Sequence, residues 1–112
     1  MNTTLDLTYL NTISEGDKEF IDDILNTFLE EVPKDMEQIN IALGKNDSVQ
    51  IGKMAHKVKA TLHLLGLEEL KSLAFKIEQT AKSDPNHSEI PTWAKDLVVH
   101  MEQVYPNIRQ VL

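Results

Sequence analysis

The sequence predicts an all-α protein, an antiparallel up-down-up-down four-helix bundle with a short extra helix at its N-terminus. Three observations support this fold class. Apolar residues recur every three or four positions in successive segments, as they do on one face of a helix. No segment shows the sustained two-residue alternation between hairpin turns that is typical of strands. The connections are only a few residues long, which favours antiparallel packing of consecutive helices.

The first two helices are expected on either side of a turn at residues 14–17. Asp6 can cap a short helix over residues 7–13, because its carboxylate can accept a hydrogen bond from the first turn. A much longer helix follows, with a wide apolar face over its first four turns. Pro33 lacks an N–H and therefore ends or kinks a helix. Since the apolar period resumes at once, we expect a kinked helix that continues to Gly44.

The third helix is expected to begin at a cap formed by Asp47 or Ser48. It is expected to end near Leu65, where Gly66 allows a tight reversal of the chain. One apolar stripe runs along this helix at spacings of four and three. The stripe consists of Ile51, Ala55, Val58, Leu62 and Leu65.

Two further helices complete the predicted bundle. The fourth carries an apolar stripe over residues 67–81, and the turn-forming residues 83–86 predict a loop after it. The last helix is expected to begin within residues 88–91 and to carry apolar residues as far as Val111. Pro106 is expected to bend or fray its end. Burial of these stripes should suffice for a stable monomer.

Length and composition fit one domain that covers residues 1–112. The chain is 41% apolar and 26% charged, and its formal net charge of −7 argues against a nucleic-acid partner. It contains no cysteine, which excludes disulfides and thiolate metal sites. The N-terminus has no signal-peptide pattern, and no stretch approaches the roughly 20 apolar residues that cross a bilayer. We therefore expect a soluble cytoplasmic protein without a membrane partner.

His56 falls at the edge of the apolar stripe of the third helix, because a neighbour of Ala55 sits about 100° further round. Gly52, Lys59 and His63 share this polar line with it at helical spacings. A histidine there can expose an imidazole nitrogen, so the pattern suggests a nucleophile that receives an anion. Glycine inside a helix costs about 1 kcal/mol relative to alanine. Gly52 therefore points either to an open lane beside the imidazole or to close helix packing.

The sequence around His56 is positively charged within an acidic protein. No Asp or Glu lies between residues 48 and 67, whereas Lys53, Lys57 and Lys59 all do. We interpret this as a local positive site. Lys57 and Lys59 would place charge near whatever the imidazole carries.

These residues also follow the order of a known motif. Ala55-His56-Lys57-Val58-Lys59-Ala60 is followed by Leu65-Gly66-Leu67, by Leu70, and then by Ile77-Glu78. In order and spacing they resemble the histidine-containing phosphotransfer (HPt) domain family. Its pattern is Ala-His-x-Leu-Lys-Gly, a Leu-Gly pair, a Leu, and a terminal Glu or Gln. Val58 replaces the usual Leu, and Ala60 replaces the usual Gly, which adds a methyl group close to the histidine.

The resemblance implies that Nε2 of His56 carries a phosphoryl group. Glu78 occupies the position of the acceptor that holds the other ring nitrogen as N–H. Lys59, which is expected to face solvent, and Lys57 would stabilise the phosphoryl oxygens. The surface that docks a receiver domain is expected to include Gly52, Lys53, Ala60, His63 and Phe75.

The resemblance further implies a phosphocarrier of two-component signalling that has no kinase activity of its own. Its expected partners are response-regulator receiver domains and a hybrid sensor histidine kinase. The sequence has no phosphate-cradling glycine-rich loop, no nucleotide motif and no evident Mg²⁺ carboxylate cluster. No cofactor or metal is therefore expected in this chain, and the partner receiver domain is expected to bring both the reactive aspartate and Mg²⁺.

Two alternatives remain open at this point. An interaction bundle would dock a receiver or a kinase without carrying phosphate, and Ala60 is the feature that favours it. A dimerising structural four-helix protein would explain the apolar stripes, but it would not explain the polar line around His56.

Overall fold

The computed structural model describes all 112 residues and contains five helices and no strand. The helices are α1 (Thr8–Ile13), α2 (Lys18–Gly44), α3 (Ser48–Leu64), α4 (Glu68–Ser83) and α5 (Ile90–Val111). The all-α class predicted from the sequence is thus confirmed. No helix is both long enough and apolar enough to span a membrane.

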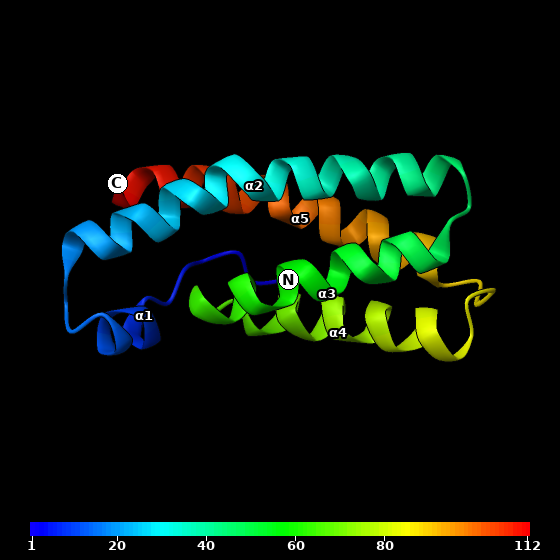
Figure 1. The fold of residues 1–112 in the computed structure, drawn as a ribbon, viewed down its shortest axis with the longest axis horizontal. Helices are drawn as coiled ribbons and strands as arrows, with labels where there is room; N and C mark the ends of the chain where they lie inside the picture. The colour runs from blue at the N-terminus through cyan, green and yellow to red at the C-terminus, as the bar shows by residue number, and fades with distance from the viewer.

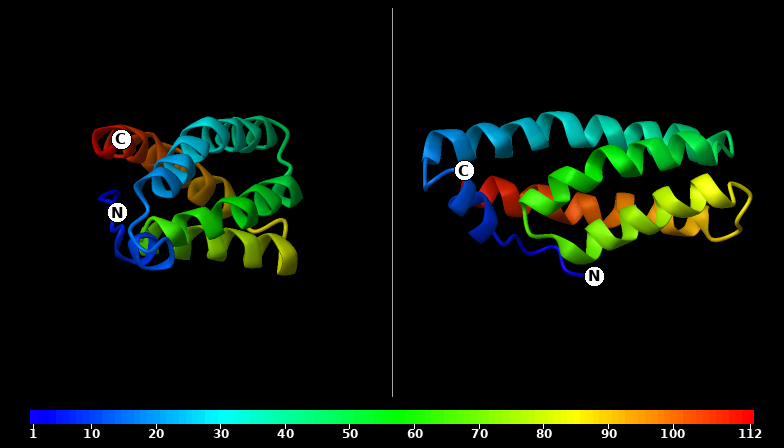
Figure 2. Two further views of the ribbon diagram at one scale, coloured as in Figure 1. Left: turned by 60° about the vertical axis from the view of Figure 1, so that its left-hand side comes forward. Right: turned by 60° about the horizontal axis from the view of Figure 1, so that its bottom comes forward.

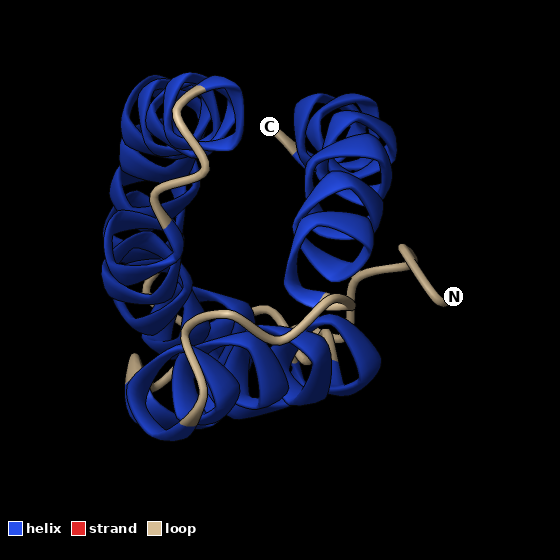
Figure 3. Cartoon of the chain, turned by 90° about the vertical axis from the view of Figure 1, so that its right-hand side faces the viewer, coloured by secondary structure: helices blue, strands red, loops and turns tan.

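The four long helices lie along the 44 Å axis of a molecule that measures 21 and 20 Å across (Figure 1). The ribbon turns back at each connection between them. Helices α2 and α4 each pack against both α3 and α5, so that α3 lies between them on one side (Figure 2). Viewed from one end, the helices surround a common centre (Figure 3). One cluster of 25 buried apolar residues, drawn from all five helices, fills that centre.

Aspartate side chains cap the N-termini of α2 and α3, each of which follows a tight turn. The carboxylate of Asp17 accepts the N–H of Phe20 at 3.3 Å at the start of α2, and that of Asp47 accepts the N–H of Gln50 at 3.1 Å at the start of α3. Helix α2 continues through Pro33 to Gly44, as predicted. Figure 1 shows it changing direction where its colour passes from blue to cyan.

The predicted stripes of α3 and α4 are buried in full, but the outermost apolar residues of other helices are not. Ile13, Phe20 and Val111 are 46%, 45% and 46% exposed. Each lies at the end of its helix, where the neighbouring helices no longer cover it. In Figure 1, for example, α2 begins well beyond the end of α3. Helical period alone therefore overestimates burial at these ends.

The N-terminal segment is fixed against the turn between α3 and α4. The N–H of Asp6 donates to the carbonyl of Leu65 at 3.0 Å. Gly66 adopts a φ of +68°, and a Cβ there would lie 2.6 Å from both the Cβ and the carbonyl oxygen of Asp6. Glycine is required at this turn for its backbone conformation and for this close approach. The carboxylate of Asp6 also accepts the N–H of Thr8 at 3.0 Å. Leu7 is the N-cap of α1, so Asp6 lies one residue before the cap position.

Candidate functional site

His56 lies in the middle of α3, with its imidazole facing both solvent and α4. The buried stripe of α3, which includes Ala55 and Val58, places His56 at the edge of the helix contact. The His56 side chain is 66% exposed. On the α4 side, its Nδ1 lies 2.5 Å from Oε2 of Glu78. The protein thus engages one ring nitrogen and leaves Nε2 open to a partner.

Glu78 is a buried carboxylate with three nitrogen partners. The residue is 3% exposed. Besides His56, its Oε1 accepts from Nζ of Lys59 at 2.7 Å, and its Oε2 lies 3.4 Å from Nζ of Lys82. The hydrogen bond from Lys59, followed by that from His56, outweighs burial and lowers the pKa of Glu78 to about 2. The carboxylate is therefore ionised at neutral pH.

The ionised state of Glu78 determines the tautomer of His56. A carboxylate can only accept hydrogen bonds, so Nδ1 of His56 must be the donor in their contact. In the neutral ring the lone pair then resides on Nε2. The pair fixes the direction of the ring and presents a nucleophilic nitrogen to solvent.

Lys59 is less exposed than the sequence led us to expect. Its side chain is 25% exposed. Its ammonium donates a hydrogen bond to Glu78 and lies 5.0 Å from the ring centroid of Phe75. The expectation of a solvent-facing Lys59 was wrong, because the buried carboxylate holds the ammonium against α4. Phe75 is itself half exposed beside that ammonium, in a cation–π contact.

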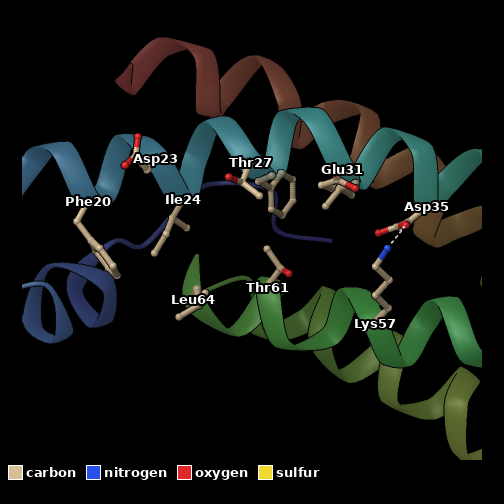
Figure 4. Close-up of a pocket in the computed structure, with 11 residues that line it drawn as sticks. Phe20, Asp23, Ile24, Thr27, Glu31, Asp35, Lys57, Thr61 and Leu64 are labelled. Atoms are coloured by element: carbon tan, nitrogen blue, oxygen red, sulfur yellow. Dashed lines mark hydrogen bonds and ion pairs between the residues drawn. The ribbon is translucent and has the colours of Figure 1, made fainter.

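Lys57 points away from Glu78. Its Nζ donates to Oδ1 of Asp35 on α2 at 2.8 Å, a bridge that Figure 4 shows across the space between α2 and α3. Asp35 is 6% exposed, and its hydrogen bond raises the pKa of Lys57. A residue directly after His56 faces about 100° further round α3, which here is toward α2. The expectation that Lys57 acts on the phosphoryl oxygens is corrected accordingly: its charge lies at the α2–α3 contact.

A groove of about 410 Å³ runs along α2 and α3 from the Asp35–Lys57 pair. Apolar side chains, among them Phe20 and Leu64, line it toward the α1 end, and Glu31 lies near the pair (Figure 4). The groove lies along the edge of α3 that faces α2. Glu78 lies at the opposite edge of α3, which faces α4.

Gly52 lies one turn before His56 and is buried against α4. A Cβ at this position would lie 2.7 Å from the Cβ of Ala81, closer than two nonbonded carbons approach. This contact supports close helix packing as one explanation for Gly52. Gly52 also lines the hollow beside His56, so the open lane that the sequence offered as the other explanation is present too. The backbones of α3 and α4 approach each other one turn away from the His56–Glu78 pair.

A hollow of about 450 Å³ opens beside His56 between α3 and α4. Lys53 of α3 and Lys82 of α4 line it together with His56 and Glu78. The sequence predicts Lys53 at this surface, but Lys82 is absent from the predicted site. Its position one turn after Glu78 on the same helix is the signal that would have found it.

His63 continues the polar line of α3 away from this hollow, and Ala60 lies beside that line. Ala60 is exposed, one turn after His56. His63 contacts other groups: its Nδ1 lies 3.1 Å from Nζ of Lys71, and its ring packs on Tyr9 with centroids 4.8 Å apart. The structure therefore places His63 at the α1 end of α3, outside the cluster around His56.

Comparison with known proteins gives a match in structure. The crystal structure of histidine-containing phosphotransfer protein B (HptB) from Pseudomonas aeruginosa PAO1 is similar to this chain, with a TM-score of 0.82. The two are 19% identical, and the match covers 95% of this chain and 91% of that chain. At this identity the likeness shows the fold. No curated protein matches the sequence.

A family model matches as well. The model for the Hpt domain matches residues 23–110, a range that contains His56, Glu78 and the lysines described above. The match extends over most of the 112 residues. The chain therefore belongs to the Hpt domain family.

Proposed function

We propose that this protein is a phosphorelay intermediate that accepts a phosphoryl group on Nε2 of His56 from a receiver-domain aspartate and passes it to a response regulator. Membership of the Hpt family supports a role in two-component phosphorelay in general. One observation carries the assignment to His56. An imidazole that is 66% exposed is held through Nδ1 by a carboxylate that is 3% exposed.

The proposed step is a direct exchange of one bond for another. The lone pair of Nε2 attacks the phosphorus atom of an aspartyl phosphate. An N–P bond forms while the bond from phosphorus to the aspartate oxygen breaks, and the aspartate leaves as a carboxylate. Nδ1 keeps its hydrogen, so the ring becomes cationic. The Glu78 carboxylate, 2.5 Å from Nδ1, stabilises that positive charge as it develops.

Lys59 acts through Glu78 in this proposal. Its ammonium keeps the carboxylate ionised and occupies Oε1, which leaves Oε2 directed at the histidine. Phosphoryl transfer depends on positioning and charge stabilisation more than on covalent chemistry by the protein. A fixed, ionised Glu78 supplies both for the nucleophile.

The remaining parts of the reaction belong to the partners. We assign the reactive aspartate and the Mg²⁺ to a receiver domain, and the first phosphodonor to a hybrid sensor histidine kinase. In this chain no group of three or more His, Cys, Asp or Glu side chains is placed to hold a metal ion. The proposal describes a cytoplasmic, monomeric carrier with a single domain over residues 1–112, an up-down-up-down four-helix bundle and no kinase activity of its own.

The test is transfer of labelled phosphate from a phosphorylated receiver domain in the presence of Mg²⁺. Wild-type protein should take up label as a phosphoramidate that is labile in acid and stable in base. His56→Gln should take up none, whereas the matched control His100→Gln, which changes a histidine of α5 outside the predicted docking surface, should behave as wild type. Label on His56→Gln at the wild-type level would show that the site is wrong. Receiver binding without any label on the wild-type protein would instead establish a non-phosphorylated interaction bundle.

A further inference from the structure

The cluster around Glu78 holds more positive charge than the carboxylate requires. Lys59 and Lys82 each contribute one positive charge against the single negative charge of Glu78. With a neutral His56 ring, the cluster therefore has a net charge of one positive unit. Phosphorylation would add roughly two negative charges on the phosphoryl oxygens and one positive charge on the ring. The cluster becomes neutral only when the anion is present.

The two lysines differ in how firmly Glu78 holds them. Nζ of Lys59 lies 2.7 Å from Oε1, and its side chain is 25% exposed. Nζ of Lys82 lies 3.4 Å from Oε2, and its side chain is 68% exposed. The lowered pKa of Glu78 is accounted for by Lys59 and His56 without Lys82. The 3.4 Å contact is long for a charged hydrogen bond, and Lys59 and His56 keep the buried carboxylate paired, so Lys82 can leave Glu78 at small cost.

Lys82 is also in the right place to meet a phosphoryl group. It lines the hollow beside His56 and approaches the same oxygen, Oε2, that accepts from Nδ1 of the ring. The flexible four-carbon stem of a lysine allows its ammonium to move from the Nδ1 side of the ring toward a group on Nε2. Lys57 is paired with Asp35 and has no contact with Glu78.

We propose that, once His56 is phosphorylated, Nζ of Lys82 moves from Oε2 of Glu78 to the phosphoryl oxygens and stabilises the phosphohistidine form. This inference rests on the proposed function. The titratable groups that line the hollow are Lys53, His56, Glu78 and Lys82, and Lys59 contacts Glu78 from α3. Lys82 and Lys53 are the exposed cations among them, and Lys82 is the one in contact with the carboxylate.

The test observes the phosphoryl group itself. Protein phosphorylated with phosphoramidate, which requires no receiver, is titrated with pH while the ³¹P chemical shift is recorded. In Lys82→Met the pKa of the phosphoryl group should rise by about half a unit, a roughly threefold weaker preference for the dianion. Lys82→Arg should stay close to wild type because it keeps the charge. Lys95→Met, which removes an exposed lysine of α5 and changes net charge equally, should also stay close to wild type.

The outcomes separate this inference from the proposed function. If wild-type protein takes no phosphate on His56, the proposed function fails and this inference fails with it. If His56 is phosphorylated but Lys82→Met shifts the ³¹P titration no more than Lys95→Met does, only the role of Lys82 is overturned. Helical circular dichroism of each variant checks that the fold is retained, and Lys82→Arg decides whether the charge or the side-chain packing is responsible.

Discussion

Two buried carboxylates pair with lysines on opposite edges of α3, and only one of them also holds an exposed histidine. Glu78 of α4 holds Lys59 at 2.7 Å, and Asp35 of α2 holds Lys57 at 2.8 Å. The carboxylate side chains are 3% and 9% exposed, so both are removed from solvent. What differs is the additional partner: Glu78 also holds the exposed ring of His56. A buried ion pair therefore does not by itself mark a functional site.

The two regions also differ in how completely their polar groups are paired. Around Glu78, both carboxylate oxygens have nitrogen partners. Near Asp35, the hydroxyl of Tyr105 is buried without a hydrogen-bond partner. Burial first, and then the charges of Glu102 and Asp35, raise the pKa of Tyr105 to about 12. A buried group of α5 is thus left unpaired near Asp35, which is consistent with a role in packing, whereas the α3–α4 edge is organised around a charge.

The largest expected contrast comes from removing each carboxylate charge in turn. Glu78→Gln keeps an acceptor for Nδ1 of His56 but no longer stabilises a cationic ring, so phosphoryl transfer should slow by about 100-fold. Asp35→Asn should leave the transfer rate within about twofold and lower the thermal unfolding midpoint. Transfer from a phosphorylated receiver and thermal circular dichroism measure the two effects. Equal loss of transfer in both variants would remove the distinction between the two edges.

The same two edges should lose stability at opposite ends of the pH range. The pKa of Glu78 falls from 4.5 to about 2 on folding, so its contribution is complete above 4.5 and is lost as pH falls toward 2. The pKa of Lys57 is raised above 10.5, so its contribution is complete below 10.5 and is lost as pH rises through the higher folded value.

Chemical denaturation across pH tests this second contrast. Glu78→Gln should flatten the decline in unfolding free energy on the acid side and leave the alkaline side unchanged. Lys57→Met should do the reverse. An acid decline of wild-type steepness in Glu78→Gln would mean that other carboxylates govern acid unfolding.

The smallest expected effect comes from Ala60→Gly, at a position one turn from both His56 and Lys57. Ala60→Gly should destabilise the protein by about 0.5–1 kcal/mol, since glycine loses more backbone entropy in a helix. It should also speed transfer from non-cognate receivers, because the added methyl group no longer obstructs them. Thermal unfolding and transfer rates on one variant separate the two effects.

Ala60→Leu serves as the opposite control. It should block transfer from a receiver while phosphoramidate still labels His56. A wild-type rate of transfer from the receiver would confine docking to the Glu78 edge of α3, and the interface would not reach the edge that Lys57 and Asp35 occupy.

Much of the fold could be predicted from helical period, and part of the site from spacing. The stripe from Ile51 to Leu65 determines which side of α3 is buried, and His56 follows at its edge. Asp35 was missed although the sequence contained its signal. It takes an apolar-stripe position of α2, in the series Phe28, Val32, Asp35, Ile39 and Ala42, and the whole series is buried. A lone carboxylate on such a stripe needs a cationic partner.

The remaining errors depend on contacts between helices, which no single helix encodes. The low exposure of Lys59 follows from the burial of Glu78, and the burial of Glu78 follows from how closely α4 approaches α3. Lys57 was assigned by its proximity to His56 in sequence, whereas its direction is decided by the position of α2. Residue type and spacing predict which histidine is the nucleophile, but the identity of each lysine's partner is a tertiary property.

The close contact between Gly52 and Ala81 has a consequence for protein design. Grafting His56, Glu78 and their lysines onto another helical scaffold would not reproduce the site unless the distance between the two helices were copied too. Any side chain at position 52 would meet Ala81, 2.7 Å away, and would force α3 and α4 apart one turn from the His56–Glu78 pair. The smallest transferable unit is therefore a pair of helices with their point of closest approach, and the glycine belongs to it as much as the histidine does.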